Sequence, residues 1–352
     1  MRKQVSEVVI MDKFYRMLNE LLPDMEKQLY KRLDMLKAIE KYQPIGRRLL
    51  ANKLNAPERT LRQVVDEMKE SNLITVQHSG MMITEKGQYL LEYFEDMVSE
   101  ENQIKEKEKQ LAKILNITST HIAEGDSSKN PKGLNDVGKS VNKVLDRYLP
   151  KGENVIAVMG GRSVAAAADN LTPALSQNRD LLFISGRGGM GAESSIQSNV
   201  ICDKMAQLTD GESKALYTPD QMSDEAYETL IHEPSISETL KTMQQANALI
   251  FGIGEAETMI SRRNFNESLT KRLIDQKVVG EAFGEYFTAS GEVVYRLKRI
   301  GLQIEDLEHI PLVIAVASGN EKSVAIEAFM KNAPYNVQLV TDEGAANKIL
   351  EV

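Results

Sequence analysis

The chain has 352 residues, of which 42% are hydrophobic and 27% charged, and its formal net charge is −8 at pH 7. This length allows two or three domains, whereas a single cysteine and four scattered histidines exclude a disulfide framework and argue against a metal centre. The chain has no apolar run near the about 18 residues of a membrane helix, and its N-terminus lacks the apolar segment of a signal peptide. We therefore expect a cytoplasmic protein without a membrane partner.

The negative charge is unevenly distributed along the chain. Residues 1–98 carry 16 basic and 15 acidic side chains, whereas the remainder carries 27 and 36. Within residues 41–69, seven basic side chains stand against three acidic ones. A local basic patch on an acidic chain is typical of a small nucleic-acid-binding module joined to a domain of other purpose, although a solvated helical face would carry the same charge.

A winged helix-turn-helix is predicted near the N-terminus. Apolar residues at helical spacing mark three helices, and Pro57 suits the first turn of the third. Two short apolar runs around His78-Ser79-Gly80 predict a hairpin. In chain order the predicted elements are helices over 31–42, 45–54 and 57–72, a hairpin over 73–84, and a helix that includes 89–94. This order is typical of a winged helix-turn-helix, which we expect over residues 1–95.

The third predicted helix has the character of a recognition helix. Arg59 and Arg62 lie one turn apart near its N-terminal end, the part of such helices that reaches base edges. Arg47 and Arg48, at the start of the preceding helix, suit contacts with phosphates. A helical hairpin used for oligomerisation is the alternative. The predicted DNA-binding residues are Arg47, Arg48, Arg59, Thr60, Arg62, Gln63 and Lys69.

A charged helical linker is predicted over residues 96–115. Apolar residues recur every seven positions at Leu90, Met97, Ile104 and Leu111, as in a coiled-coil seam, but charged residues occupy the partner positions. The pattern therefore leaves two possibilities open, a dimerising coiled coil and a solvated linker helix.

Strands and helices alternate in residues 116–352. The predicted strands cover 154–159, 181–185, 248–253, 277–283, 312–317 and 336–340, and the intervening helices include 192–208, 221–231 and 323–332. Such alternation predicts an α/β fold, a doubly wound, mostly parallel, Rossmann-like sheet with helices on both faces.

Glycine-rich segments follow several of these strands. They cover residues 160–163, 186–191, 252–255, 280–281 and 318–323. Ligands of open α/β sheets bind beyond the carboxyl ends of the strands, where glycine lets backbone N–H groups approach an oxyanion. Cationic side chains in or near these segments, Arg162, Arg187, Arg262, Arg263 and Lys322, favour an anionic ligand.

A dinucleotide site and an enzyme active site are two alternatives for these segments. Residues 186–191 match the dinucleotide motif G-x-G-x-x-G, but Arg187 inside the loop and the lack of an acidic residue near 214–217 argue against it. A sugar-phosphate isomerase or deaminase would need a general base, for which Glu281 and Glu255 are the candidates. Neighbouring arginines favour an ionised carboxylate, which suits hydrogen bonds to hydroxyls better than proton abstraction. We therefore expect no catalytic residue, no metal and no cofactor, with such an enzyme carrying an appended DNA-binding module as the alternative.

Four long segments carry a resemblance that covers nearly the full chain. They are "GRGGMGAESSIQSNVICDKMA", "YTPDQMSDEAYETLIHEPSI", "VVGEAFGEYF" and "VTDEGAA". With them the chain resembles the SorC family of bacterial transcriptional regulators. The resemblance implies a sugar-phosphate sensor and oligomerisation domain of the NagB/ribose-5-phosphate-isomerase-like fold, expected over residues 116–352. It further implies a repressor of glycolytic genes, a homodimer or homotetramer that binds double-stranded operator DNA and is relieved by fructose 1,6-bisphosphate.

The resemblance also implies roles for residues of the sensor. Gly160, Gly161, Arg162 and Ser163 would hold one phosphate, and Glu281 would accept hydrogen bonds from sugar hydroxyls. Arg162 stands where the family usually has threonine, so a hydroxyl donor is replaced by a forked cation, which leaves the choice of effector open. The expected effector-binding residues are Gly160, Gly161, Arg162, Ser163, Arg187, Gly188, Gly189, Arg262, Arg263, Glu281 and Lys322.

Overall fold

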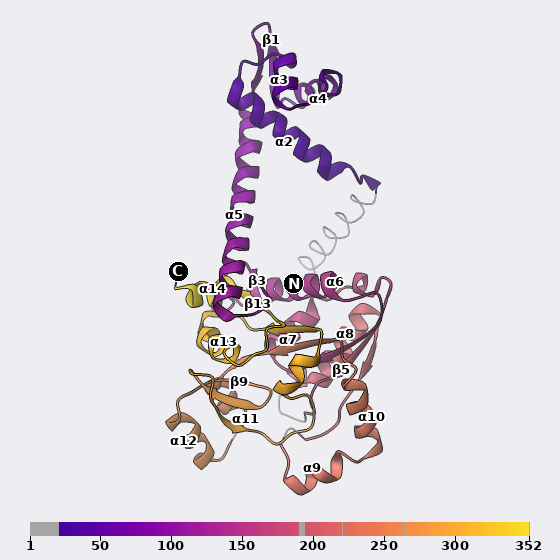
Figure 1. Cartoon of the computed structure of the whole chain (residues 1–352), viewed down its shortest axis with the longest axis vertical. Coiled ribbons are helices and arrows are strands. Elements are labelled where there is room, and N and C mark those ends of the chain that lie inside the picture. Colours follow the sequence, from indigo (N-terminus) through magenta and orange to yellow (C-terminus); the bar gives the residue numbers. More distant parts are fainter. Residues whose placement is uncertain (1–20, 190–193, 220, 264, 352) are drawn as a thin grey trace. The chain divides into compact units, whose positions relative to one another are not determined.

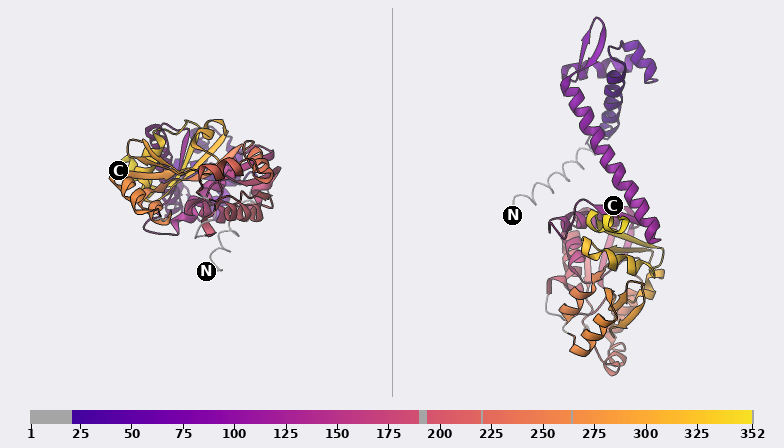
Figure 2. Two further views of the ribbon diagram at one scale, coloured as in Figure 1. Left: turned by 90° about the horizontal axis from the view of Figure 1, so that it is seen from below. Right: turned by 90° about the vertical axis from the view of Figure 1, so that its left-hand side faces the viewer.

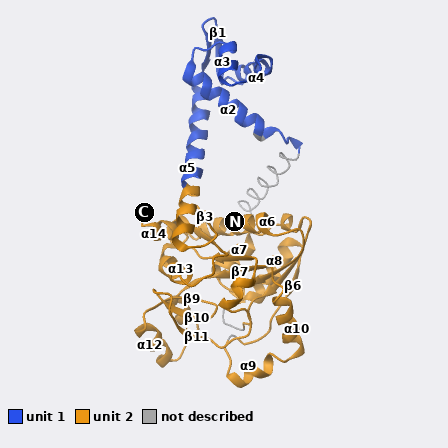
Figure 3. Cartoon of the chain, viewed as in Figure 1, with its two compact units in different colours: residues 1–103 blue, residues 104–352 orange. Residues whose placement is uncertain are grey.

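The computed structural model describes residues 21–189, 194–219, 221–263 and 265–351. The chain divides into two compact units, Met1–Gln103 and Ile104–Val352 (Figures 1 and 3). None of the helices in these described ranges combines the length and the apolar character needed to cross a membrane.

The first unit is a winged helix-turn-helix, as predicted. Its elements are α2 (Met25–Tyr42), α3 (Arg47–Lys53), α4 (Glu58–Glu70), β1 (Ile74–Gln77), β2 (Gly80–Ile83) and the N-terminal part of α5 (Glu85–Leu115). The predicted apolar faces form its core, in which Ile39 of α2, Leu61 and Met68 of α4 and Met81 of β2 are buried.

The wing is fixed to the segment before α3. Ile45 pairs with Met81 through backbone hydrogen bonds in both directions. Gly80 has φ of 136°, and a Cβ atom there would lie 2.8 Å from the backbone nitrogen of Ile45. Only glycine fits this close approach, so the hairpin is held against the helix-turn-helix.

Helix α5 contributes to the cores of both units. Leu91 is buried in the core of the first unit, while Leu111 and Leu115 are buried in the core of the second. Met97, by contrast, is 51% exposed. The residues at seven-residue spacing therefore do not form one continuous exposed seam, and the residues predicted as a helical linker, 96–115, lie in this helix.

A seven-stranded parallel sheet forms the centre of the second unit (Figures 1 and 2). Its strands, in the order β3-β13-β12-β7-β4-β5-β6, are paired in parallel throughout. They are β3 (Ser119–Ala123), β4 (Gly152–Val158), β5 (Arg179–Ser185), β6 (Glu212–Lys214), β7 (Ala248–Gly252), β12 (Leu312–Val316) and β13 (Val337–Asp342). This confirms the predicted doubly wound α/β fold.

Helices cover both faces of this sheet. Alternate residues of a strand point to opposite faces, so Ile156 and Val158 of β4 belong to one buried cluster and Ala157 to another. The first cluster includes residues of α6 (Gly133–Tyr148), α7 (Arg162–Asp169) and α8 (Ser198–Thr209). The second includes residues of α10 (Pro234–Met243), α13 (Ser323–Met330), α14 (Glu343–Leu350) and the end of α5.

The strand order places a topological switch point between β4 and β7. From β4 the chain proceeds outward to β5 and β6, and then returns to β7 on the other side of β4. Loops at the carboxyl ends of two such strands diverge and leave a crevice in which ligands bind.

One predicted strand lies in a different sheet. The segment predicted over 277–283 is β9 (Val278–Ala282), which belongs to a four-stranded antiparallel sheet with β8 (Gly254–Glu255), β10 (Glu285–Thr288) and β11 (Val293–Arg296). Its place in the parallel sheet was therefore predicted wrongly, and Gly280 and Glu281 lie inside a strand instead of at its end. Phe283 and Gly284, both with positive φ, form a two-residue hairpin turn after β9. Helices α9 (Asp224–Leu230), α11 (Ala256–Arg263) and α12 (Glu267–Asp275) complete the unit.

Candidate functional site

A cavity of about 380 Å³ opens in the second unit where β4 and β7 end. Segments 159–163 and 251–255, at the carboxyl ends of these two strands, line it together with parts of α11 and β9. Most of the predicted effector-binding residues lie in its wall: Gly160, Gly161, Arg162, Ser163, Arg187, Arg262, Arg263, Glu281 and Lys322.

The turn before α7 allows close approach of its neighbours. A Cβ atom on Gly160 would lie 2.7 Å from the carbonyl oxygen of Ile196 and 2.8 Å from a guanidinium nitrogen of Arg187. Gly161 has φ of 132°, precedes the helix, and donates its N–H to the same carbonyl at 2.9 Å. The Gly161 amide is thus already bonded within the protein. The amides that a ligand could reach begin with that of Arg162, in the first turn of α7, where N–H groups have no intrahelical acceptor.

Lys322 contacts that helix start from the loop after β12. It ends the short turn η4 (Asn320–Lys322) after β12, and its Nζ donates to Ser163 Oγ at 3.2 Å. Loss of hydration lowers the pKa of its ammonium group to about 8. The positive charges of Arg162 and Arg262 lower this pKa as well, while Glu321 and Asp342 oppose the shift.

The cavity is rich in positive charge. Its described lining contains six basic side chains, Arg162, Arg187, Arg262, Arg263, Arg299 and Lys322, and three carboxylates, Glu255, Glu281 and Glu321. Two of these carboxylates are engaged in the protein, as the following contacts show. The excess of cations matches an anionic ligand better than a neutral one.

Glu281 is held in a fixed position inside β9. It is 6% exposed, and its Oε1 accepts the N–H of Gly284 at 2.7 Å and a guanidinium N–H of Arg263 at 3.3 Å. Arg263 thus orients Glu281 through a buried ion pair. The arrangement presents a carboxylate group, a hydrogen-bond acceptor, to the cavity.

Glu255, the second candidate for a general base, caps helix α11. Its two carboxylate oxygens accept the backbone N–H groups of Glu257 and Thr258 at 2.9 and 2.8 Å. Burial opposes the ionised form, but hydrogen bonds from Thr258 and Glu257 hold the pKa of Glu255 below its usual value. The residue therefore serves the helix and is poorly suited to accept a proton.

Gly188 and Gly189, predicted as effector-binding, lie outside the described lining of the cavity. Gly188 is needed for packing, because a Cβ atom there would overlap Thr218 Oγ1 at 1.7 Å. The rest of that glycine motif, residues 190 and 191, lies outside the described residues.

Some lining residues had no signal in the sequence. Arg299 is 4% exposed, donates to the carbonyl of Leu302 at 3.2 Å, and its guanidinium carbon lies 5.9 Å from the ring centre of Phe283. It belongs to a short basic stretch that resembles a solvated surface segment, so only the tertiary fold brings it to the cavity.

The predicted DNA-binding residues lie on α3 and α4 of the first unit. Arg48 and those on α4 are exposed, and Arg47 is partly buried. Gln63 donates to Glu67 at 2.9 Å, and Glu67 also pairs with Arg32. Among the residues that the structure describes, it shows no ion pair for Arg47, Arg48, Arg59, Arg62 or Lys69.

Two family models match the chain, one for each part. The model of a sugar-binding domain, Sugar-bind, matches residues 99–351, and that of the CggR N-terminal DNA binding domain matches residues 29–98.

Known proteins are similar over most of the chain. The central glycolytic genes regulator of Bacillus subtilis is 41% identical over 340 residues, 97% of this chain and 99% of that protein. A crystal structure of a SorC family transcriptional regulator from Enterococcus faecalis is 42% identical, with a TM-score of 0.66 over 70% of this chain and 99% of that one. The full-length sorbitol operon regulator SorC of Klebsiella pneumoniae, at 18% identity, shares the fold with a TM-score of 0.64 over 90% of this chain and 97% of its own.

Proposed function

Because the chain belongs to the SorC family of transcriptional regulators, we propose that it represses glycolytic genes and releases its operator when a sugar phosphate binds. The effector that we propose is fructose 1,6-bisphosphate. The two family models identify a DNA-binding and a sugar-binding domain in the chain, and the similar proteins are transcriptional regulators and not enzymes.

The start of α7 supports a phosphate site. The free amides of its first turn carry the positive end of the helix dipole, and Lys322 adds an ammonium group 3.2 Å from the Ser163 hydroxyl. Arg162, the first residue of α7, is exposed and supplies a forked guanidinium group in the cavity wall. This juxtaposition of Lys322 and the α7 start is the observation that carries the proposal.

The remaining charges support a ligand with a second anionic group. Arg187, Arg262 and Arg299 also line the cavity, which supports a second anionic group on the ligand besides the one beside Arg162 and Lys322. A sugar bisphosphate carries two phosphate groups, and the carboxylate of Glu281 would accept hydrogen bonds from the hydroxyls of the sugar. Catalysis would need a general base, but Glu255 caps a helix and Glu281 is paired with Arg263.

Operator binding follows from the first unit. We propose that a homodimer or homotetramer places two α4 helices in successive major grooves, about 34 Å apart. Arg59, Thr60, Arg62 and Gln63 would face base edges, while Arg47, Arg48 and Lys69 would contact phosphates. The effector lowers operator affinity if it binds more tightly to an assembly with a different spacing, a coupling of about 1–3 kcal/mol.

A ligand panel tests the effector class. Thermal unfolding of the full chain is followed with fructose 1,6-bisphosphate, fructose 6-phosphate, glucose 6-phosphate and unphosphorylated fructose. A ligand at about 100 times its Kd stabilises a folded protein by about 2.7 kcal/mol. We expect the largest increase in Tm with the bisphosphate and none with fructose; equal increases with phosphorylated and unphosphorylated sugars would contradict the proposal.

A further inference from the structure

We propose that Asp342 is a positioning residue of the phosphate site, which fixes the turn that carries Lys322 and supplies a negative charge that acts on its ammonium group. The inference rests on the proposed function, in which Lys322 contacts a phosphate. Asp342 is absent from the cavity lining among the described residues, so it would act through Lys322 and not by contact with the ligand.

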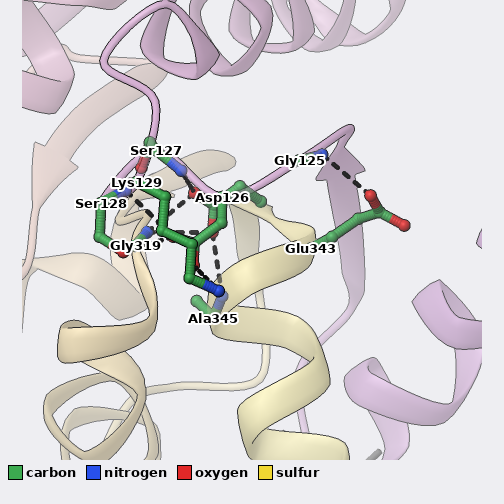
Figure 4. A network of polar contacts seen from close by, with 9 residues as sticks. Gly125, Asp126, Ser127, Ser128, Lys129, Gly319, Glu343 and Ala345 are labelled. Atoms are coloured by element: carbon green, nitrogen blue, oxygen red, sulfur yellow. Dashed lines mark hydrogen bonds and ion pairs between the residues drawn. The ribbon is translucent and has the colours of Figure 1, made fainter.

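Backbone amides from two loops and from the first turn of α14 converge on the Asp342 carboxylate. The residue ends β13, caps α14 and is 0% exposed. It accepts the N–H of Gly319 with both oxygens at 2.9 Å, that of Ser127 at 2.7 Å and that of Ala345 at 3.0 Å. Figure 4 shows these three amides grouped together.

The two loops follow the strands on either side of β13. Ser127 follows β3, Gly319 follows β12, and β13 with Asp342 lies between those two strands. The Ser127 hydroxyl also donates to the Ser318 hydroxyl at 3.0 Å. A single buried carboxylate therefore fixes the height of the β12 loop relative to the sheet.

The position of Lys322 depends on that loop. Gly319 has φ of 96°, and its carbonyl accepts the N–H of Lys322 at 3.0 Å to close the turn. If the Gly319 amide lost its acceptor, this turn would lose its attachment to β13, and the Lys322 ammonium its place beside Ser163.

The charge of Asp342 also acts on Lys322. The charged groups that face this ammonium are Glu321 on its own turn, Arg162 on α7, Arg262 on α11 and Asp342 on β13. Desolvation and the two arginines lower the pKa of Lys322 to about 8, and the two carboxylates oppose them. Removal of the Asp342 charge therefore lowers the pKa of Lys322 further, so that less of Lys322 is charged at neutral pH.

The test compares unmutated protein with Asp342→Asn by calorimetric titration of the full chain with fructose 1,6-bisphosphate, from pH 6 to pH 9. The ratio of the two Kd values cancels the titration of the ligand itself. We expect the Kd of the variant divided by that of unmutated protein to rise about fivefold between pH 6 and pH 8, since Lys322 loses its proton at lower pH in the variant. A purely structural defect would give the same ratio at every pH.

Asp126→Asn is the matched control. Asp126 lies in the same group of contacts (Figure 4), but its carboxylate accepts the amide and the hydroxyl of Ser128 and not the amide of Gly319. This variant should keep the affinity and the pH profile of the unmutated protein.

If Asp342→Asn does not fold, Gly319→Ala tests the same turn. The added Cβ atom would lie 2.5 Å from a carboxylate oxygen of Glu321, at a backbone conformation that alanine avoids. We expect weaker binding, and unchanged affinity would overturn the role of the turn. A Kd ratio for Asp342→Asn that does not depend on pH would overturn the inference alone, whereas failure of the unmutated chain to bind the bisphosphate would overturn the proposed function with it.

Discussion

The ammonium nitrogen of Lys322 lies 3.2 Å from the hydroxyl oxygen of Ser163. This contact joins the loop after β12 to the first turn of α7, across the crevice at the switch point of the sheet. It brings a lysine with a lowered pKa to a helix N-terminus that is short of acceptors. Both partners would be satisfied by one phosphate.

Lys322→Met should weaken binding of fructose 1,6-bisphosphate by roughly 10- to 100-fold, because a charge-assisted hydrogen bond contributes about 1.5–3 kcal/mol. The measurement is calorimetric titration at pH 7. Lys143→Met, which changes an exposed lysine of α6, is the control and should leave Kd unchanged. Equal affinities for the two variants would remove Lys322 from the site.

The ligand-free protein should become more stable when Lys322 is replaced by methionine. The folded state holds the pKa of Lys322 at about 8, below the ordinary lysine value of 10.5, so the unfolded chain binds more protons between these two values. The unfavourable contribution of Lys322 to the stability of the folded state is therefore complete below pH 8, and it fades as pH rises to about 10.5. Thermal unfolding should show a higher Tm for the variant at pH 7 than at pH 10, relative to unmutated protein at the same pH. A lower Tm at pH 7 would contradict this.

Binding of the bisphosphate should decline above pH 8. A phosphate favours the protonated form of Lys322, and the pKa of about 8 makes this proton scarce at higher pH. Below that value affinity should vary little once the phosphate groups are fully ionised; above it, the decline approaches tenfold per pH unit. Titrations from pH 7 to pH 9.5 check the profile, and Lys322→Arg should flatten it.

Arg162→Ala should change both the affinity and this profile. Arg162 lowers the pKa of Lys322 through its charge, so its removal raises that pKa and moves the decline in affinity to higher pH. The loss of the guanidinium group should weaken binding at pH 7, and Arg162→Lys, which keeps the charge, should restore the profile. An unchanged pH profile in the alanine variant would show that the charge of Arg162 does not act on the pKa of Lys322.

The double variant Arg59→Ala, Arg62→Ala should lose preference for operator over random DNA, at about 1–3 kcal/mol for each base contact. Arg47→Ala should instead weaken binding to both DNAs alike and lower the salt slope by about one. Lys37→Ala is the control, since Lys37 pairs with Glu95. Fluorescence anisotropy with both DNAs measures each effect. Retained sequence preference in the double variant would contradict the assignment of α4 as the recognition helix.

Periodicity was sufficient to predict the winged helix-turn-helix and five of the seven strands of the parallel sheet, because long amphipathic helices and buried strands have distinct patterns. The apolar face of α4 and the buried run of β12 are examples. The edge strands β3 and β6 were not predicted. The same rule failed for β9, since its apolar run resembles a buried parallel strand. The turn that shows its true pairing, Phe283-Gly284, lacks the Asn-Gly or Asp-Gly signature of such hairpins.

The site was predictable where glycine and charged residues follow a strand, as in the segments 160–163 and 318–323. It was not predictable for Arg299, which reaches the cavity from a segment without a motif, or for Asp342, whose hydrogen-bond donors come from two separate loops and the start of α14. Gly188 shows the reverse case, a motif glycine that close packing against Thr218 requires.

The central claim is tested most directly by operator affinity in the presence of effector. Anisotropy titrations of operator DNA with the full chain, with and without saturating fructose 1,6-bisphosphate, measure the coupling for unmutated protein and for Lys322→Met. The account predicts that saturating bisphosphate weakens operator binding by roughly 5- to 150-fold in unmutated protein, and that Lys322→Met needs roughly 10- to 100-fold more bisphosphate for the same effect. Operator affinity that does not respond to the bisphosphate, or responds at equal bisphosphate concentrations in both proteins, would contradict it.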